Sequence, residues 1–197
     1  LRARGAMAAV FERAGAKVSS LDMRGPLSLP SAVVRLARCM RSMQPEVTST
    51  WMYHADLVGS LAARIAGVAG PAWGIHNGDL AIARTRRSTR AVIRLNARLS
   101  GSLPQRILCC SHTARRMHVA QGFRDDRFQV IPNGFDMERF RPSDEARRTV
   151  REELGLAPDT LLVGLVARWH PVKDHPSFMR AASRLAQDHP GVHFLLA

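Results

Sequence analysis

The sequence contains few lysines, few cysteines and no long apolar run, and the last two shortages each exclude a class of protein. Three cysteines, with Cys109 and Cys110 adjacent, fit neither a disulfide framework nor a CxxC metal or redox motif. No uninterrupted apolar stretch approaches the roughly 20 residues of a membrane-spanning helix, and the start lacks the zones of a signal peptide. We therefore expect a globular cytoplasmic protein whose cysteines are reduced.

Lysine is the most unusual shortage, because only Lys17 and Lys173 stand among the 29 basic residues, and the others are arginine. The formal net charge of +13 allows three interpretations: nucleic-acid binding, an anionic membrane surface, or a general bias towards arginine. With one tyrosine and no recognisable binding motif, the chain lacks the interleaved aromatic residues of a nucleic-acid surface. We expect no nucleic acid partner, although a basic binding module remains an alternative.

Short apolar runs alternate with amphipathic stretches along the 197 residues, which is typical of an α/β protein with parallel sheets and helices on both faces. The expected strands lie at 17–23, 46–51, 72–76, 107–110, 128–131 and 161–167, and from residue 192. The expected helices begin at Ser31, span 56–66, 86–99, 114–121 and 143–155, and begin again near Pro176.

Two helices carry specific expectations about their faces. The helix expected at 56–66 should turn Leu57, Leu61 and Ile65 inward, and the helix expected at 86–99 should bury Val92, Leu95 and Leu99. The second helix also carries a stripe of arginines at spacings of three and four, which could contact anionic lipid or simply face solvent. The stripe consists of Arg87, Arg90, Arg94 and Arg98.

A change of pattern after Pro132 predicts a domain boundary. We expect a partial first domain at 1–132, a linker at 133–145 and the start of a second domain at 146–197. Asn133 tolerates left-handed geometry and Gly134 permits positive φ, so both are predicted to shape a hinge turn. The chain starts without Met and stops inside an apolar run, so we expect it to be an internal fragment.

The second predicted domain carries a candidate anion site. Arg168 and Lys173 follow the apolar strand at 161–167, where a guanidinium fork and a compact ammonium could both hold phosphate. A solvated surface loop is the alternative. His170, Asp174 and His175 lie close in sequence but lack a recognisable metal-ligand spacing, so no metal is expected.

These residues resemble the retaining, GT-B-fold glycosyltransferases of family 4, in the bacterial surface-polysaccharide type. The resemblance rests on the hinge segment 130–142 with Arg168 and Lys173, and on the segments 45–56, 74–77 and 110–111. It implies two Rossmann-like domains, the first receiving the acceptor and the second holding a nucleotide sugar. It also implies that the glycine-rich loop and the paired glutamates of the family lie outside this chain, so the fragment alone is expected to be inactive.

The resemblance implies roles for the other candidate residues. His76 is expected to be catalytic and to face the transferred sugar, whereas a His at a strand end can also satisfy backbone groups only. His54 and Asp56 are expected to line the acceptor cleft, although Asp56 could be an ordinary charge in a first helical turn. Ser111 could point into the same cleft or cap the following helix.

The implied reaction is the retaining transfer of a hexosyl group from a nucleotide diphosphate sugar to a glycan or lipid-linked acceptor. It needs no cofactor, because Arg168 and Lys173 could neutralise the leaving diphosphate in place of Mg²⁺. The expected location is cytoplasmic, with peripheral contact at the inner face of the plasma membrane through the arginine stripe. A sugar-nucleotide epimerase or a phosphorylase of the same fold is the second enzymatic interpretation.

Overall fold

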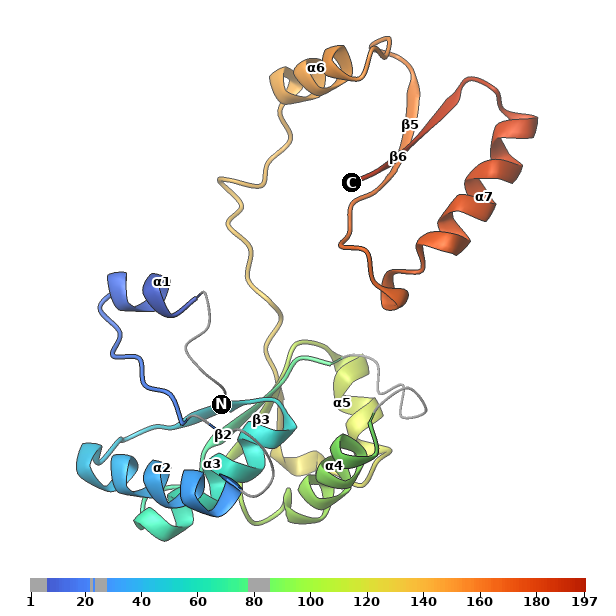
Figure 1. The fold of residues 1–197 in the computed structure, drawn as a ribbon. Helices are drawn as coiled ribbons and strands as arrows, with labels where there is room; N and C mark the ends of the chain where they lie inside the picture. Colours follow the sequence, from blue (N-terminus) through green and yellow to red (C-terminus); the bar gives the residue numbers. More distant parts are fainter. Residues whose placement is uncertain (1–6, 22, 24–27, 78–85) are drawn as a thin grey trace. The chain divides into compact units, whose positions relative to one another are not determined.

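The computed structural model describes residues 7–21, 23, 28–77 and 86–197 (Figure 1). The chain forms two compact units, Leu1–Gly134 and Phe135–Ala197, which are described separately. The division falls within the range 133–145 that the sequence suggested for a linker.

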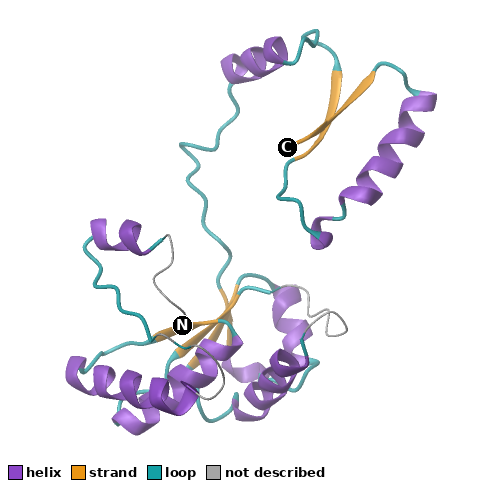
Figure 2. Cartoon of the chain, in the orientation of Figure 1, coloured by secondary structure: helices purple, strands orange, loops and turns teal. Residues whose placement is uncertain are grey.

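Unit 1 contains a four-stranded parallel sheet in the order β1-β2-β3-β4, with helices between its strands (Figure 2). Its elements are α1 (Ala8–Arg13), α2 (Leu29–Met43), β1 (Ser49–Trp51), α3 (Tyr53–Ala66), β2 (Ala72–Ile75), α4 (Arg87–Leu99), β3 (Arg106–Cys109), α5 (His112–Val119), the 3-10 turn η3 (Asp125–Arg127) and β4 (Phe128–Val130). The register pairs Trp51 with Gly74 and Ile75 with Cys109.

Unit 2 contains the parallel strands β5 and β6, paired from Leu161 with Val192 to Leu165 with Leu196. Its elements are α6 (Asp144–Glu153), β5 (Leu161–Leu165), the 3-10 turn η4 (Pro171–Lys173), α7 (His175–Asp188) and β6 (Val192–Leu196). Helix α6 begins where the Ser143 side chain accepts a hydrogen bond from the Ala146 amide, as expected of a serine N-cap.

The main core of unit 1 lies on one face of the sheet. Because side chains alternate along a strand, Trp73 and Ile75 point to this face, together with Ile107 and Cys109 of β3. Helices α3, α4 and α5 complete the cluster with Tyr53, Ile93, Ala97 and Ala114, and the loop after α5 adds Phe123. Within the described residues the other face is more exposed. In β1, Ser49 and Trp51 lie on that face and are exposed, whereas Thr50 between them is buried.

Small residues allow helix α3 to pack closely on two sides. Gly59 lies against β1, where an added Cβ would stand 2.5 Å from Cγ2 of Thr50. A second apolar cluster joins α3 to α2 through Val33, Ala37, Val58, Ala62 and Ala66. The expected inward face of this helix was wrong, since Leu61 is 36% and Ile65 51% exposed. Because the helices pack closely, α3 turns its small residues Ala62 and Ala66 inward and leaves the larger Leu61 and Ile65 outside.

Helix α4 also buries a different face from the one expected. Leu95 is 42% exposed, whereas Ile93, Asn96 and Ala97 are buried. Asn96 Nδ2 donates a 2.8 Å hydrogen bond to the carbonyl of Tyr53, so a polar contact between helices fixes the rotation of α4.

The strand expected at 17–23 is absent from the described part of that segment. Residues 17–21 and 23 are loop, and residue 22 lies outside the described residues. Alternation of apolar residues indicates a strand only where a neighbour supplies ladder hydrogen bonds, and the described β1 pairs only with β2.

Among the described glycines of unit 1, Gly70 should tolerate substitution least. A Cβ there would clash with the backbone carbonyl of Leu103, which cannot move aside as a side chain could. We expect Gly70→Ala to lower the free energy of unfolding by about 1 to 3 kcal/mol in urea titrations. Gly191→Ala is the matched control, because nothing lies within 4 Å of its added Cβ. Equal stability of the two variants would contradict this packing.

Candidate active site

The predicted first-domain residues follow the carboxyl ends of four adjacent strands. Because the strands are parallel, these ends meet along one edge of the sheet, which is where open α/β folds bind ligands. His54 and Asp56 follow β1, His76 follows β2, Ser111 follows β3, and Asn133 and Gly134 follow β4.

At this edge the rings of Trp51 and His76 are stacked, with centroids 4.3 Å apart and planes 3° from parallel. The register explains the contact. Trp51 pairs with Gly74, and His76 lies two residues after Gly74, just beyond the end of β2 and on the same side as Gly74. Gly74 has no side chain, and a Cβ there would stand 3.0 Å from the carbonyl of Thr50 and 3.6 Å from the indole.

The turn between β1 and α3 has an unusual backbone conformation. Met52 has φ of 70° and ψ of 156°, a region that residues other than glycine rarely adopt. Its amide donates a 2.9 Å hydrogen bond to the carbonyl of Gly74, which continues the ladder by one residue. The turn directs Tyr53 into the core and leaves His54 exposed.

A chain of hydrogen bonds runs from the core of unit 1 to Asn77, the exposed residue after His76. His118 Nδ1 donates to the carbonyl of Ala114 at 2.7 Å, so its Nε2 must accept from the Tyr53 hydroxyl at 2.9 Å. Burial raises the pKa of Tyr53 to about 12, and the hydrogen bond from the Asn77 side chain opposes that rise. Burial lowers the pKa of His118, which favours the neutral ring that this chain requires.

Asp56 does not line a cleft in unit 1, because its side chain is fully buried in the first turn of α3. Its Oδ1 accepts a 2.6 Å hydrogen bond from the Thr50 hydroxyl, while its Oδ2 has no partner among the described residues. Burial raises the pKa of Asp56 to about 7, and the Thr50 bond opposes part of that rise. The carboxyl group therefore joins β1 to α3.

Ser111 caps helix α5, and its hydroxyl accepts a 3.1 Å hydrogen bond from the Ala114 amide. The sequence left two roles open for Ser111, facing the cleft or capping the helix, and this hydrogen bond is the helix cap. The half-buried side chain still lies at the carboxyl edge.

The backbone reason given for the hinge was wrong. Neither Asn133 nor Gly134 has positive φ, and both are exposed in extended loop. An added Cβ at Gly134 would meet nothing within 4 Å. The segment is therefore open chain rather than a turn that requires glycine, and a hinge role stays a prediction.

In unit 2, Arg168 and Lys173 are exposed on the segment between β5 and α7, beyond the carboxyl end of β5. Lys173 ends the turn η4, where His170 Nδ1 accepts a 3.3 Å hydrogen bond from the Val172 amide. Asp174 follows with φ of 49° and caps α7 by accepting from the Ser177 amide at 3.4 Å. We name residues 168–173 the donor loop.

His175 anchors both ends of the donor loop. It is buried at the start of α7, and its Nε2 donates a 3.2 Å hydrogen bond to the carbonyl of Ala167. The ring also lies 4.6 Å from that of Trp169. Sequence reasoning had considered His175 only as a metal ligand, and it likewise missed Trp51, Tyr53 and His118. The available signal was the single tyrosine of the chain, which directly precedes His54.

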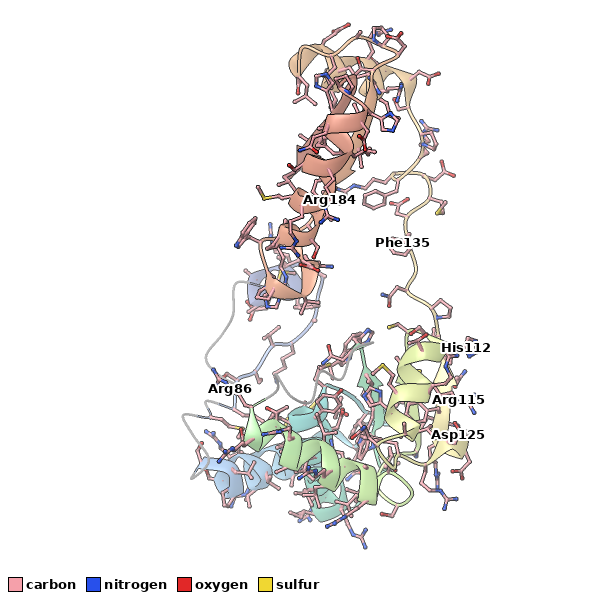
Figure 3. The ribbon with its side chains drawn as sticks, turned by 90° about the vertical axis from the view of Figure 1, so that its right-hand side faces the viewer. Arg86, His112, Arg115, Asp125, Phe135 and Arg184 are labelled. Carbon is pink, nitrogen blue, oxygen red and sulfur yellow. The ribbon has the colours of Figure 1, made fainter. Side chains whose placement is uncertain are left out.

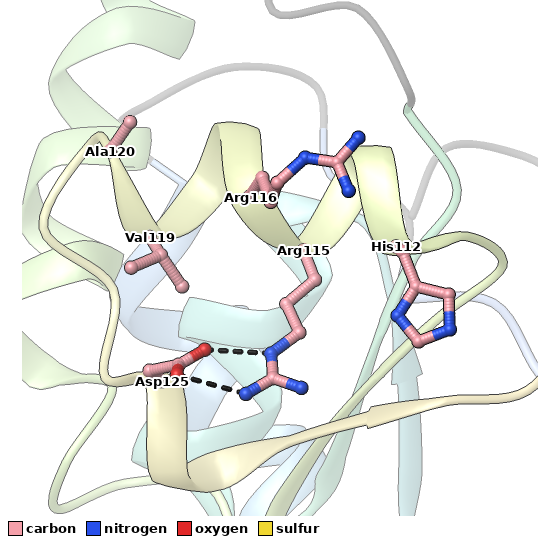
Figure 4. Close-up of a pocket in the computed structure, with 6 residues that line it drawn as sticks. All are labelled: His112, Arg115, Arg116, Val119, Ala120 and Asp125. Atoms are coloured by element: carbon pink, nitrogen blue, oxygen red, sulfur yellow. Dashed lines mark hydrogen bonds and ion pairs between the residues drawn. The ribbon is translucent and has the colours of Figure 1, made fainter.

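A surface hollow lies along α5, and none of the candidate site residues described above lines it (Figure 4). Arg115 crosses it to Asp125 with two hydrogen bonds of 2.7 and 2.8 Å, which hold the pKa of Asp125 below its usual range. Figure 3 shows both residues with His112 on the same side of unit 1. Because Arg115 is already paired, the hollow has less capacity for an anion than its arginines suggest.

No group of three or more His, Cys, Asp or Glu side chains suited to a metal ion occurs among the described residues. No described helix is long and apolar enough to cross a membrane.

The arrangement of parallel strands and helices matches that of a solved structure. Anabaena HepE, crystallised with UDP-glucose, superposes with a TM-score of 0.72 at 22% sequence identity, over 98% of this chain and 50% of that one. The likeness confirms the α/β class with parallel sheets and the GT-B architecture expected from the sequence.

The family is shown by sequence. Residues 3–139 match the model of Glycosyltransferase Family 4, and the chain belongs to that family. A D-inositol 3-phosphate glycosyltransferase of Nocardia farcinica is 41% identical over 78 residues, covering 40% of this chain and 17% of that protein. The Escherichia coli UDP-Gal:alpha-D-GlcNAc-diphosphoundecaprenol alpha-1,3-galactosyltransferase is 23% identical over 158 residues, covering 80% and 41%. The chain thus spans less than half the length of these two relatives.

The buried carboxyl group of Asp56 predicts a specific dependence of stability on pH. Its pKa of about 7 lies above the ordinary 3.8, so the folded state holds the proton more tightly than the unfolded state. Its contribution to stability is present below pH 4 and is lost as the pH rises to 7. Across that window we expect Asp56→Asn to gain roughly 2 to 4 kcal/mol relative to the wild type in urea titrations.

Asp125→Asn is the control of opposite sign. Its pKa is lowered by Arg115 from the ordinary 3.8, so wild type should gain on this variant only as the pH rises towards 3.8, and the two should run parallel across the window of Asp56. Parallel pH profiles for wild type and Asp56→Asn would contradict the buried protonated carboxyl group.

Proposed function

We propose that the protein transfers a sugar from a nucleotide diphosphate sugar to a glycan or lipid-linked acceptor, with retention of configuration. The observation that carries the proposal is the donor loop. It places an exposed guanidinium and an exposed ammonium beyond the carboxyl end of β5, on a segment that the His175 to Ala167 hydrogen bond closes at its base. Two cations on a loop that is held at its base suit a diphosphate.

The reaction breaks the bond between the anomeric carbon and the diphosphate oxygen, and both electrons leave with the diphosphate. The acceptor hydroxyl oxygen forms the new bond, and its proton passes to an oxygen of the leaving diphosphate. Negative charge therefore grows on the leaving group, where Arg168 and Lys173 would stabilise it more in the transition state than in the ground state. Since two cations supply this charge, the proposal includes no metal ion and no cofactor.

On unit 1, His76 is the residue proposed to face the transferred sugar. It is exposed at the carboxyl end of β2, next to the supported Asn77, and its ring nitrogens can exchange hydrogen bonds with sugar hydroxyls. His54 is exposed one strand away and could contact the acceptor. The buried Asp56 supports this edge through Thr50 and is removed from the proposed contact set.

The names of the relatives favour this chemistry over an epimerase or a phosphorylase. The Escherichia coli relative is named for a UDP-Gal donor and a diphosphoundecaprenol-linked acceptor, and HepE was crystallised with UDP-glucose. By analogy we propose a hexosyl donor and an acceptor of the bacterial cell surface. With such an acceptor, the protein would act at the cytoplasmic side of the membrane.

Loss of Lys173 should abolish most of the donor-dependent transfer. In the complete protein we expect Lys173→Ala to lower kcat about 100- to 1000-fold, the usual effect of removing one preorganised donor to a developing anion. The assay follows radiolabelled sugar from a nucleotide diphosphate sugar into product.

Lys17→Ala is the matched control, because it removes the only other lysine from an exposed site in unit 1. Full activity in Lys173→Ala would show that the donor loop does not hold the leaving group. Lys173→Arg should recover only part of the activity, because a planar fork does not replace a compact ammonium.

The arginine stripe of α4 supports a peripheral membrane contact within the same proposal. Arg87, Arg94 and Arg98 are exposed and Arg90 is half-buried, while the opposite side of the helix carries the buried Ile93 and Ala97. A lipid-linked acceptor would then meet a protein already held at an anionic surface, where each basic residue contributes roughly 1 kcal/mol.

Vesicle co-sedimentation tests this contact. Replacing Arg94 and Arg98 together with Gln should weaken binding to vesicles containing anionic lipid roughly 30-fold, and should not affect neutral vesicles. The double replacement of Arg38 and Arg64, exposed on α2 and α3, removes the same charge from other helices and is the control. Equal losses of vesicle binding in the two double variants would mean that net charge alone determines binding, and would contradict a specific membrane-binding surface on α4.

A further inference from the structure

The strand-end histidine of unit 1 has an aromatic partner with no role in the function proposed above. We propose that Trp51 is a positioning residue, which fixes the plane of the His76 imidazole so that its ring nitrogens meet the sugar edge-on. The inference rests on the proposed role of His76 and deepens it by naming what orients that ring.

The stack restrains the ring of His76 in a way that the backbone alone does not. An exposed histidine at a strand end can rotate about two side-chain bonds, and only contacts on its ring select one orientation. With centroids 4.3 Å apart and planes within 3°, the indole covers one face of the imidazole. The ring can then slide or tilt only at the expense of that contact, and its two nitrogens remain uncovered at the ring edge.

Trp51 is itself held at several points, so it can serve as a support. Its strand pairs with β2, and the adjoining Met52 amide donates to the carbonyl of Gly74. The absence of a side chain at Gly74 leaves room for the indole beside β2. Thr50, the residue before it, is tied to the buried carboxyl group of Asp56.

A separate contact holds the backbone on the far side of His76. Asn77 donates to the Tyr53 hydroxyl, which in turn donates to the buried His118. The two supports are different in kind: the Tyr53 chain fixes where the peptide lies, and Trp51 fixes how the imidazole is turned. Only the second should depend on the shape of residue 51.

Steady-state kinetics of the complete protein test the proposal with variants that separate shape from apolar volume. Trp51→Leu keeps an apolar side chain but no ring, and should lower kcat roughly 2- to 12-fold, the range that a measured aromatic pair is worth, with little change in KM for the donor. Trp51→Phe keeps a flat ring and should retain most of kcat. Val47→Ala, an exposed apolar residue before the same strand, should retain full activity.

The double variant of Trp51 and His76 decides whether the tryptophan acts through the histidine. If it does, Trp51→Leu should cost nothing further once His76→Ala is present. Additive losses would mean that the indole contacts substrate itself, which overturns the positioning role. Equal losses in Trp51→Phe and Trp51→Leu would overturn it too, since shape would then not matter.

The failure of this inference can be told from the failure of the proposed function. A large loss in His76→Ala with an unchanged Trp51→Leu would reject only the role of Trp51. Full activity in His76→Ala would reject the role of His76, and the positioning role with it. Thermal unfolding by circular dichroism should be similar for all variants, since both side chains are exposed.

Discussion

The parallel pairing of β1 with β2 at Trp51 and Gly74 is the contact on which the rest of the unit 1 site depends. It places two strand ends side by side, and the glycine leaves room for the indole that stacks on His76. It also fixes the unusual turn at Met52, after which Tyr53 enters the core and His54 stays outside. A shift of register by one residue would turn the tryptophan to the other face and separate the two rings.

Buried polar contacts then make this edge rigid in a way that an apolar core would not. The Thr50 to Asp56 bond joins strand to helix, and the chain from Asn77 through Tyr53 to His118 joins the turn after β2 to helix α5. All of these groups except the exposed Asn77 are costly to bury without their partners, so the contacts favour one arrangement. Unit 2 uses the same device where His175 closes the donor loop on Ala167 and where the buried Arg151 donates to the carbonyl of Ala157.

Much of this architecture could be predicted from the sequence, because apolar period and turn chemistry are local signals. The strands before His76 and Ser111, the helix capped by Ser143 and the exposed donor loop all follow from them. The inward faces of α3 and α4 could not, because close packing through Gly59 and the bond from Asn96 depend on residues distant in sequence. The burial of Asp56 escaped for the same reason: a carboxylate in a first helical turn is ordinarily solvated, and only the tertiary contact with Thr50 shows otherwise.

The central claim is that the donor loop holds the leaving diphosphate. The most direct measurement is a crystal structure of the complete protein with a bound nucleoside diphosphate. The account predicts phosphate oxygens within hydrogen-bonding distance, about 2.7 to 3.2 Å, of both the Arg168 guanidinium and the Lys173 ammonium. A diphosphate bound elsewhere, with both side chains in solvent, would contradict it.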